Sequence, residues 1–157
     1  MKVFRLVPLV AGLAAGIVTV LYVAIMVRQG HSPDPVSVAI ITATFASSSA
    51  AFFASATVPP SPSRIILLTW GSTVALFWTV LLNTLTPLWL PIAVLGWIAT
   101  VRVTRAYARD NEGENAWPLV GGTWAIGVAV LGIAVFGSVA VGRSPESGSG
   151  QGIATPR

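Results

Sequence analysis

The sequence predicts an all-α fold, a polytopic transmembrane bundle of five spans with a disordered C-terminal tail. The chain of 157 residues is 54% hydrophobic and only 9% charged, with a mean hydropathy of +0.80. Its apolar runs are long, and short polar or proline-rich connections separate them. This composition excludes an ordinary soluble domain and a wholly disordered chain. We expect one domain over residues 1–143 and a tail rich in Gly, Ser and Pro over residues 144–157.

The spans follow from the apolar runs and from the prolines that separate them. The first run begins like a signal peptide, but it is too long for an h-region and is expected to be retained. The fourth run is short, so its helix must continue through Arg102, whose side chain would snorkel outward. A re-entrant hairpin of the third and fourth runs is the alternative. The predicted spans are residues 6–27, 36–58, 65–86, 88–107 and 117–142.

The second span, with the core sequence SVAIITATFASSSAAFFASATV, is the segment around which we expect the bundle to assemble. On a helical projection Phe45 and Phe52 lie on a bulky side, and small residues lie roughly opposite. Small faces let helix backbones approach closely, and in lipid such packing drives helix association. We therefore expect the small side to pack against other helices, either within the chain or between chains. Its helix-packing positions are Ala39, Ala43, Ser47, Ala50 and Ala54.

Two other spans carry small residues at helix-packing spacing. Gly12 and Gly16 in the first span form a GxxxG pattern, for which close packing inside the chain is favoured over a dimerisation face. In the last span, Gly121, Ala125 and Gly132 share one side. We expect both sets to contact neighbouring helices.

A stripe of hydroxyl side chains, Thr44, Ser48 and Ser55, runs beside the small side of the second span, and Asn83 lies near the end of the third. These four residues are the candidate ligand-binding or pore-lining positions. They support the hypothesis of a protein that binds or transports a small ligand. If a structure shows these hydroxyls bonded to carbonyls of their own helix in a packed core, the hypothesis of transport loses its basis. A cavity beside the hydroxyls would favour transport.

Residues with catalytic or metal-binding chemistry are absent from the predicted spans. They hold no acid, base or histidine within their apolar cores, and the chain has no cysteine. His31 and Asp34 in the first connection are too few to ligate a metal, and a serine nucleophile would lack an activating base. We expect no enzyme, no catalytic residue and no cofactor. The predicted function is a non-enzymatic accessory, assembly or structural membrane subunit.

The basic residues indicate topology and possible lipid contacts. The net charge is +4, but the lysines and arginines lie almost wholly at the ends of apolar runs, so no nucleic acid partner is expected. Arg102, Arg105 and Arg109 share one helix face and could bind anionic lipid head groups. Topology and snorkelling are the favoured explanation of these arginines. The predicted partners are the lipid bilayer and either a membrane-protein partner or a second copy of the chain.

The distribution of basic residues predicts a multi-pass protein of the cell membrane with a cytoplasmic N-terminus and its C-terminus outside. With five spans, the side that holds the N-terminus also holds most of the lysine and arginine. These residues are Lys2, Arg5, Arg64, Arg102, Arg105 and Arg109, against Arg28, Arg143 and Arg157 on the other side.

Five spans, this length and six tryptophans resemble in outline the tryptophan-rich sensory proteins, which bind tetrapyrroles and sterol-like ligands. That family has a first loop rich in Trp and Pro and a Pro-Tyr-x-x-Trp pattern in its last span. Here the first loop is RQGHSPDP and the last span begins WPLVGGTWAIG. Because those motifs differ, no functional residue is carried over from the family.

Overall fold

The computed structural model describes residues 3–28, 34–81 and 85–142, and the predicted tail over residues 144–157 lies outside them. Within these ranges the chain forms helices joined by short connections, with no strand, which confirms the all-α prediction. Each helix is long and apolar enough to cross a membrane. The helices are α1 (Val3–Arg28), α2 (Pro35–Thr57), α3 (Pro62–Val80), α4 (Thr86–Asp110) and α5 (Trp117–Gly142).

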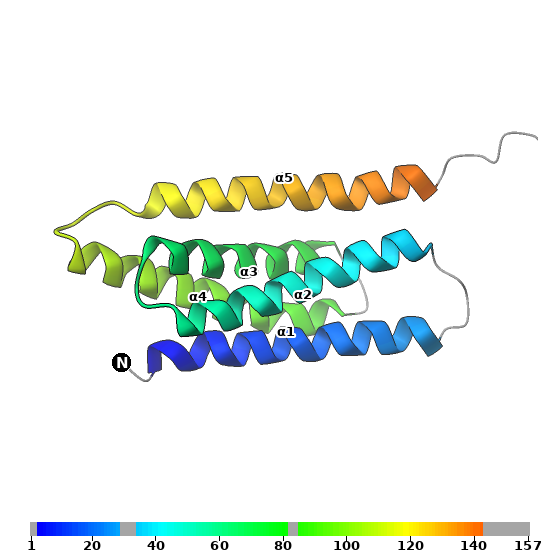
Figure 1. Cartoon of the computed structure of the whole chain (residues 1–157), viewed down its shortest axis with the longest axis horizontal. Coiled ribbons are helices and arrows are strands. Elements are labelled where there is room, and N and C mark those ends of the chain that lie inside the picture. Colours follow the sequence, from blue (N-terminus) through cyan, green and yellow to red (C-terminus); the bar gives the residue numbers. More distant parts are fainter. Residues whose placement is uncertain (1–2, 29–33, 82–84, 143–157) are drawn as a thin grey trace, which may run out of the picture.

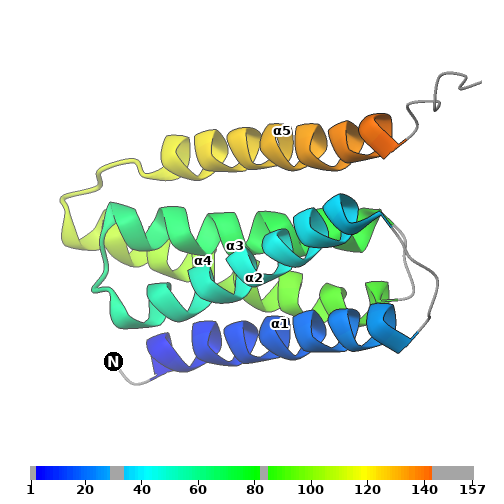
Figure 2. The same ribbon diagram turned by 45° about the vertical axis from the view of Figure 1, so that its right-hand side comes forward.

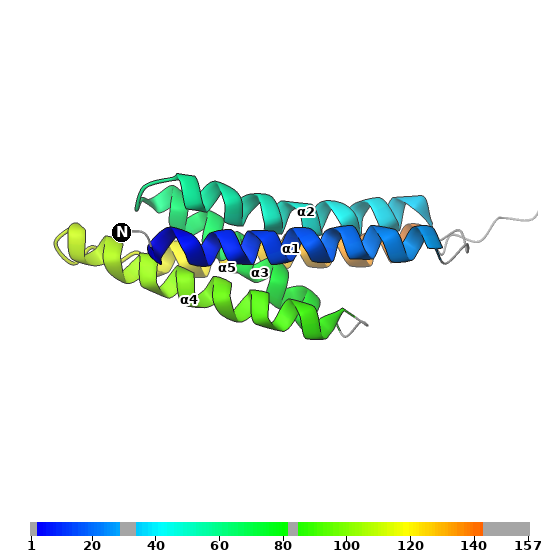
Figure 3. The ribbon, with the colours of Figure 1, turned by 90° about the horizontal axis from the view of Figure 1, so that it is seen from below.

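The helices run up and down along one axis, in three layers (Figures 1 and 2). The middle layer holds α2, α3 and α4, in which α3 packs against both of the others. On one side α1 packs between α2 and α4 (Figure 3), and on the other side α5 packs against α3 and α2. The α2–α3 and α4–α5 connections lie at the same end of the bundle as the start of α1 (Figure 1).

Helix starts follow the proline and capping signals of the sequence. A proline stands at one of the first two positions of α2, α3 and α4, where its missing N–H has no intrahelical partner to lose. Asp34 caps α2, since its carboxylate accepts from the Ser37 backbone N–H at 2.9 Å. Ser61 caps α3 through the Arg64 N–H. These caps stabilise the ends that the prolines begin.

Two boundaries differ from the predicted spans. α3 ends at Val80, with Leu81 as its C-cap, and does not reach residue 86; Pro87 instead lies in the first turn of α4. α4 begins at Thr86 and continues to Asp110, beyond the predicted end at residue 107. The continuation through Arg102 confirms that the short fourth run forms only part of a longer helix. α4 holds 25 residues, which corresponds to a length of about 37 Å.

The side chain of Phe52 occupies the centre of the middle layer and lies against a glycine from each of three other helices. A Cβ built at Gly71 of α3 would lie 3.0 Å from the Phe52 ring, and one at Gly96 of α4 would lie 2.8 Å from it. A Cβ at Gly12 of α1 would lie 3.2 Å from the Phe52 Cβ. Phe52 is fully buried. An added Cβ would clash at Gly96 and would force the Phe52 side chain to shift at Gly12 and Gly71, so we call Gly12, Gly71 and Gly96 the glycine socket.

Two turns earlier on the same face of α2, Phe45 is the centre of an aromatic cluster. Its ring centroid lies 5.2 Å from Tyr22 of α1, 5.0 Å from Trp78 of α3 and 4.7 Å from Trp89 of α4, all in edge-on geometry. Such pairs add about 0.5 to 1.5 kcal/mol each beyond the buried area. Phe45 and Phe52 therefore hold the same four helices together at two levels.

Replacing Phe52 with alanine should destabilise the bundle by about 3 kcal/mol or more, because the glycine socket would become a cavity that three helices cannot collapse to fill. The adjacent Phe53 is 39% exposed, so Phe53→Ala is the matched control and should cost much less. Thermal unfolding of both variants in detergent measures the difference. A larger loss for Phe53→Ala would contradict the socket as the centre of the core.

Candidate functional site

The predicted helix-packing side of α2 points away from the rest of the chain. Ala39, Ala43 and Ala50 are exposed, and Ser47 and Ala54 are half-buried. The buried side instead carries Phe45 and Phe52 with the hydroxyl stripe. Of the two expected arrangements, packing within the chain is not seen for the three alanines, and packing between chains remains a prediction. The bulky side of α2 faces inward because glycines of the other helices leave room for its phenylalanine side chains.

The GxxxG pair of α1 packs inside the chain, against α2. The Ser49 hydroxyl donates to the Gly12 carbonyl at 2.8 Å, and a Cβ at Gly16 would lie 3.3 Å from the Ser49 Oγ. A hydroxyl that bonds a backbone carbonyl of the next helix requires the close approach that the two glycines allow. This contact agrees with the expectation of intrachain packing at Gly12 and Gly16.

The hydroxyls of the predicted stripe on α2 are all engaged in hydrogen bonds. Thr44 donates to the Ile41 carbonyl at 2.8 Å and accepts from the indole N–H of Trp78 at 3.2 Å. Ser55 donates to the Phe52 carbonyl at 2.7 Å. Ser48 donates across to the Gly71 carbonyl of α3 at 3.0 Å.

The surroundings of the stripe are tightly packed. Ser48 and Ser55 are fully buried. An apolar hollow of about 420 Å³ lies on α1 and α2, but its lining, which includes Gly16 and Phe53, contains no residue of the stripe. Asn83, the fourth candidate, lies outside the described residues. The stripe thus acts in helix packing in this structure, with its hydroxyls bonded to carbonyls and an indole.

A second set of buried hydroxyls, which sequence reasoning missed, lies between α3 and α4. The Ser72 and Thr100 hydroxyls are 3.5 Å apart, and each also donates to a carbonyl four residues earlier in its own helix. The signal was available as hydroxyl residues at helical spacing in both segments. We call Ser72 and Thr100 the α3–α4 hydroxyl seam. Other hydroxyls of these two helices are also buried, namely Thr69, Thr73 and Thr104.

Three buried polar atoms have no hydrogen-bond partner in the described part of the chain. They are the indole nitrogens of Trp89 and Trp97 and the hydroxyl oxygen of Thr69. Trp89 belongs to the aromatic cluster, where ring contacts hold its side chain in a fully buried position. A buried polar group without a hydrogen bond lowers the stability of the fold by about 1 to 3 kcal/mol. The packing of the aromatic cluster around Phe45 has to offset this cost.

Metal-binding groups do not assemble in the described ranges. No set of three His, Asp, Glu or Cys side chains there could hold a metal ion. His31 lies outside these ranges, and Asp34 is the N-cap of α2. The hydrogen bond from the Ser37 hydroxyl, with backbone N–H groups of Ser37 and Val36, lowers the pKa of Asp34. Asp34 is thus stabilised as a carboxylate in its capping role.

The two sides of α5 differ in their contacts. Gly127 faces α3, where an added Cβ would lie 3.1 Å from the Thr73 side chain. At Gly121 and Gly132 an added Cβ would meet no atom within 4 Å, and Ala125 is exposed. The predicted packing positions Gly121, Ala125 and Gly132 therefore form an open face, which has no neighbour among the described residues.

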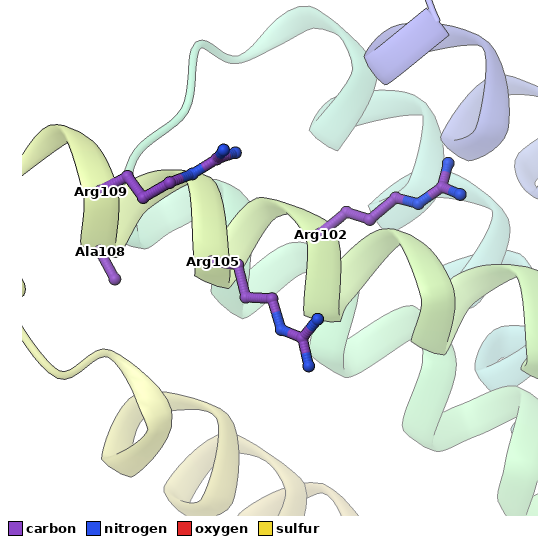
Figure 4. Close-up of a pocket in the computed structure, with 4 residues that line it drawn as sticks. All are labelled: Arg102, Arg105, Ala108 and Arg109. Carbon is purple, nitrogen blue, oxygen red and sulfur yellow. The ribbon is translucent and has the colours of Figure 1, made fainter.

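The arginines of the last turns of α4 border a hollow on the surface. Arg102, Arg105 and Arg109 are exposed, and with Ala108 they line a hollow of about 550 Å³. Figure 4 shows Arg102 and Arg109 extending to one side of α4 and Arg105 to the other. The structure thus places the three predicted residues together, and we call this surface the arginine hollow.

Comparisons with protein-family models, with curated proteins and with solved structures find no match to this chain. Its function has to follow from the packed interior, the open faces and the arginine hollow.

Adjacent alanines on α2 test the orientation of that helix. Ala51 is 5% exposed, so Ala51→Leu should force its neighbours apart and destabilise the bundle by about 1 to 3 kcal/mol. The neighbouring Ala50 is exposed, and Ala50→Leu should leave the unfolding midpoint of the isolated chain in detergent nearly unchanged. A larger effect at Ala50 would restore the orientation in which the small side faces the core.

Proposed function

We propose that the chain is a five-span integral membrane protein with a structural or accessory role in a membrane assembly and without catalytic activity. The observation that carries this proposal is the outward placement of large apolar side chains. Val20 of α1 is 69% exposed, and Ile133 and Phe136 of α5 are 74% and 68% exposed. Water-soluble proteins rarely expose apolar surface on this scale, whereas lipid tails solvate it.

The polar groups of the interior support a packing role. The Ser48 hydroxyl donates to a carbonyl of α3 and so joins α2 to α3, and the Ser72 and Thr100 hydroxyls lie 3.5 Å apart where α3 and α4 approach closely. Hydroxyls that link helices in this way are typical of membrane interiors, where the backbone approaches closely and polar side chains bond across the contact. The alternative, transport along the stripe of Thr44, Ser48 and Ser55, finds no support in this arrangement.

The open face of α5 supports an assembly role. Glycine in a helix interior costs up to about 1 kcal/mol relative to alanine, so a glycine that touches nothing brings a cost without a contact in the isolated chain. Close approach of a further transmembrane helix would use Gly121, Ala125 and Gly132 in the way that α3 uses Gly127. We infer that this face packs against a partner helix, from another membrane protein or from a second copy.

The proposed location is the cell membrane, with the N-terminus in the cytoplasm and the C-terminus outside. Arg5 at the start of α1, Arg64 at the start of α3 and the arginine hollow at the end of α4 belong to the same end of the bundle. The positive-inside rule assigns that end to the cytoplasm. With 19 residues in α3 and 25 in α4, each helix has about the length of a full crossing, which favours five spans over a re-entrant hairpin.

Topology is tested with a reporter that is active only in the cytoplasm. Inserted at Gly113, in the connection between α4 and α5, it should be active because that connection adjoins the arginines. Fused after Arg157 it should be silent, since five crossings place the C-terminus outside. Activity of the Arg157 fusion would overturn the five-span arrangement and its orientation.

Assembly is tested by a Gly121→Leu, Gly132→Leu double variant extracted from the native membrane in mild detergent. The wild-type chain should migrate in a native gel as a species larger than the monomer, and the variant should migrate as the monomer with an unchanged unfolding midpoint. Ile126→Leu, on the exposed side of the same helix, is the control and should keep the larger species. A monomeric wild type would contradict the accessory-subunit proposal.

A further inference from the structure

The guanidinium groups of the arginine hollow have no partner in the described part of the chain. Arg102, Arg105 and Arg109 are exposed and take part in no ion pair or hydrogen bond there. Asp110, Glu112 and Glu114 follow the arginines in sequence but form no ion pair with them, and Glu114 accepts a hydrogen bond from the Tyr107 hydroxyl at 3.0 Å. Three positive charges thus border one hollow with their hydrogen-bond donors unused.

The guanidinium groups of the arginine hollow are spread over both edges of α4 and do not converge on one point. Arg102 and Arg109 extend to one side of α4 and Arg105 to the other (Figure 4). Its volume of about 550 Å³ exceeds that of a single water site many times. Ala108, the remaining lining residue, is small and leaves the floor of the hollow accessible between the arginines.

The three arginines lie at the depth of a lipid head group if α4 crosses the bilayer. Measured along the helix from Thr86, Arg102 lies about 24 Å away and Arg109 about 35 Å away. The hydrocarbon core is ~30 Å thick, and the polar layer extends several ångströms beyond it. On this measure the backbone of Arg102 lies about 6 Å inside the hydrocarbon, from where its side chain can extend to the interface, and Arg109 lies in the adjoining polar layer, where phosphate groups are concentrated.

We propose that the arginine hollow is a binding site for the phosphate of an anionic phospholipid. This inference rests on the membrane location in the proposed function and adds a specific ligand class to it. Guanidinium groups bind phosphate oxygens through two parallel N–H···O bonds, which an ammonium group cannot reproduce. A lipid with net negative charge is preferred over a zwitterionic one, because no carboxylate of the described residues forms an ion pair with the three arginines.

The test compares phosphatidylglycerol with phosphatidylcholine as lipids added to the full chain in neutral detergent. Phosphatidylglycerol should raise the unfolding midpoint and should be retained after purification, as detected by mass spectrometry, whereas phosphatidylcholine should do neither. Replacing the three arginines with glutamine should weaken phosphatidylglycerol binding by roughly fivefold for each arginine removed. Equal binding of phosphatidylglycerol by the wild type and the triple glutamine variant would overturn the proposal.

Two controls separate the arginine hollow from nonspecific charge. A triple lysine variant keeps the charge and loses the planar donors, so it should bind phosphatidylglycerol more weakly than the wild type; equal binding would show that charge alone attracts the lipid and would overturn the site. Arg28→Gln, at the end of α1 far from the hollow, should bind like the wild type. A loss in this variant equal to that of Arg105→Gln would likewise overturn it.

Inorganic phosphate distinguishes a lipid site from a site for a free anion. Without lipid, millimolar phosphate should leave the unfolding midpoint unchanged. If phosphate shifts the midpoint and also prevents phosphatidylglycerol from binding, the hollow is a site for a soluble phosphate compound and the lipid proposal is wrong. The topology reporter separates the two levels of proposal. Cytoplasmic activity at Gly113 without a preference for phosphatidylglycerol rejects the lipid site alone, whereas silence at Gly113 rejects the membrane orientation on which the site depends.

Discussion

The contact of the Phe52 side chain with glycines of α1, α3 and α4 is the constraint on which the rest of the bundle depends. One large side chain fills the space where four helices converge, and each glycine of the socket lacks the atom that would displace it. Phe45 repeats this arrangement with three aromatic rings in place of the glycines. Because both residues project from one face of α2, they determine the rotation of that helix about its own axis.

The hydrogen bonds of the interior are a consequence of this close packing. A serine side chain is short, so the Ser48 hydroxyl reaches the Gly71 carbonyl only because α2 and α3 are brought together at the socket. The same glycine also adjoins the Phe52 ring. Gly96 lies against both Phe52 and Ser72, whose hydroxyl adjoins Thr100. Apolar contacts and hydrogen bonds thus involve the same glycines, Gly71 and Gly96, and both stabilise the same packing of α2, α3 and α4.

The helices could be predicted from the sequence, but the orientation of α2 could not. Long apolar runs with prolines at their starts indicate where helices begin, and α1, α2 and α5 match the predicted spans within a few residues. Which side of α2 is buried depends on the volume available on other helices. Alanines and phenylalanines are both compatible with lipid, so only the glycines at 12, 71 and 96, distant in sequence, decide that the bulky side faces inward.

The filled interior directs attention to the surface as the place where this protein acts. A transport path would need hydroxyls that are accessible along the axis, yet Ser48, Ser55 and the α3–α4 hydroxyl seam are buried in contacts between helices. The groups that remain unused in the described chain are of two kinds, the open small face of α5 and the guanidinium groups of α4. The open face of α5 could pack against a neighbouring helix, and the guanidinium groups of α4 could contact the charged head groups of a membrane. Since α5 packs on the side of α3 and α2 and makes few contacts elsewhere, a partner could reach its open face without disturbing the socket.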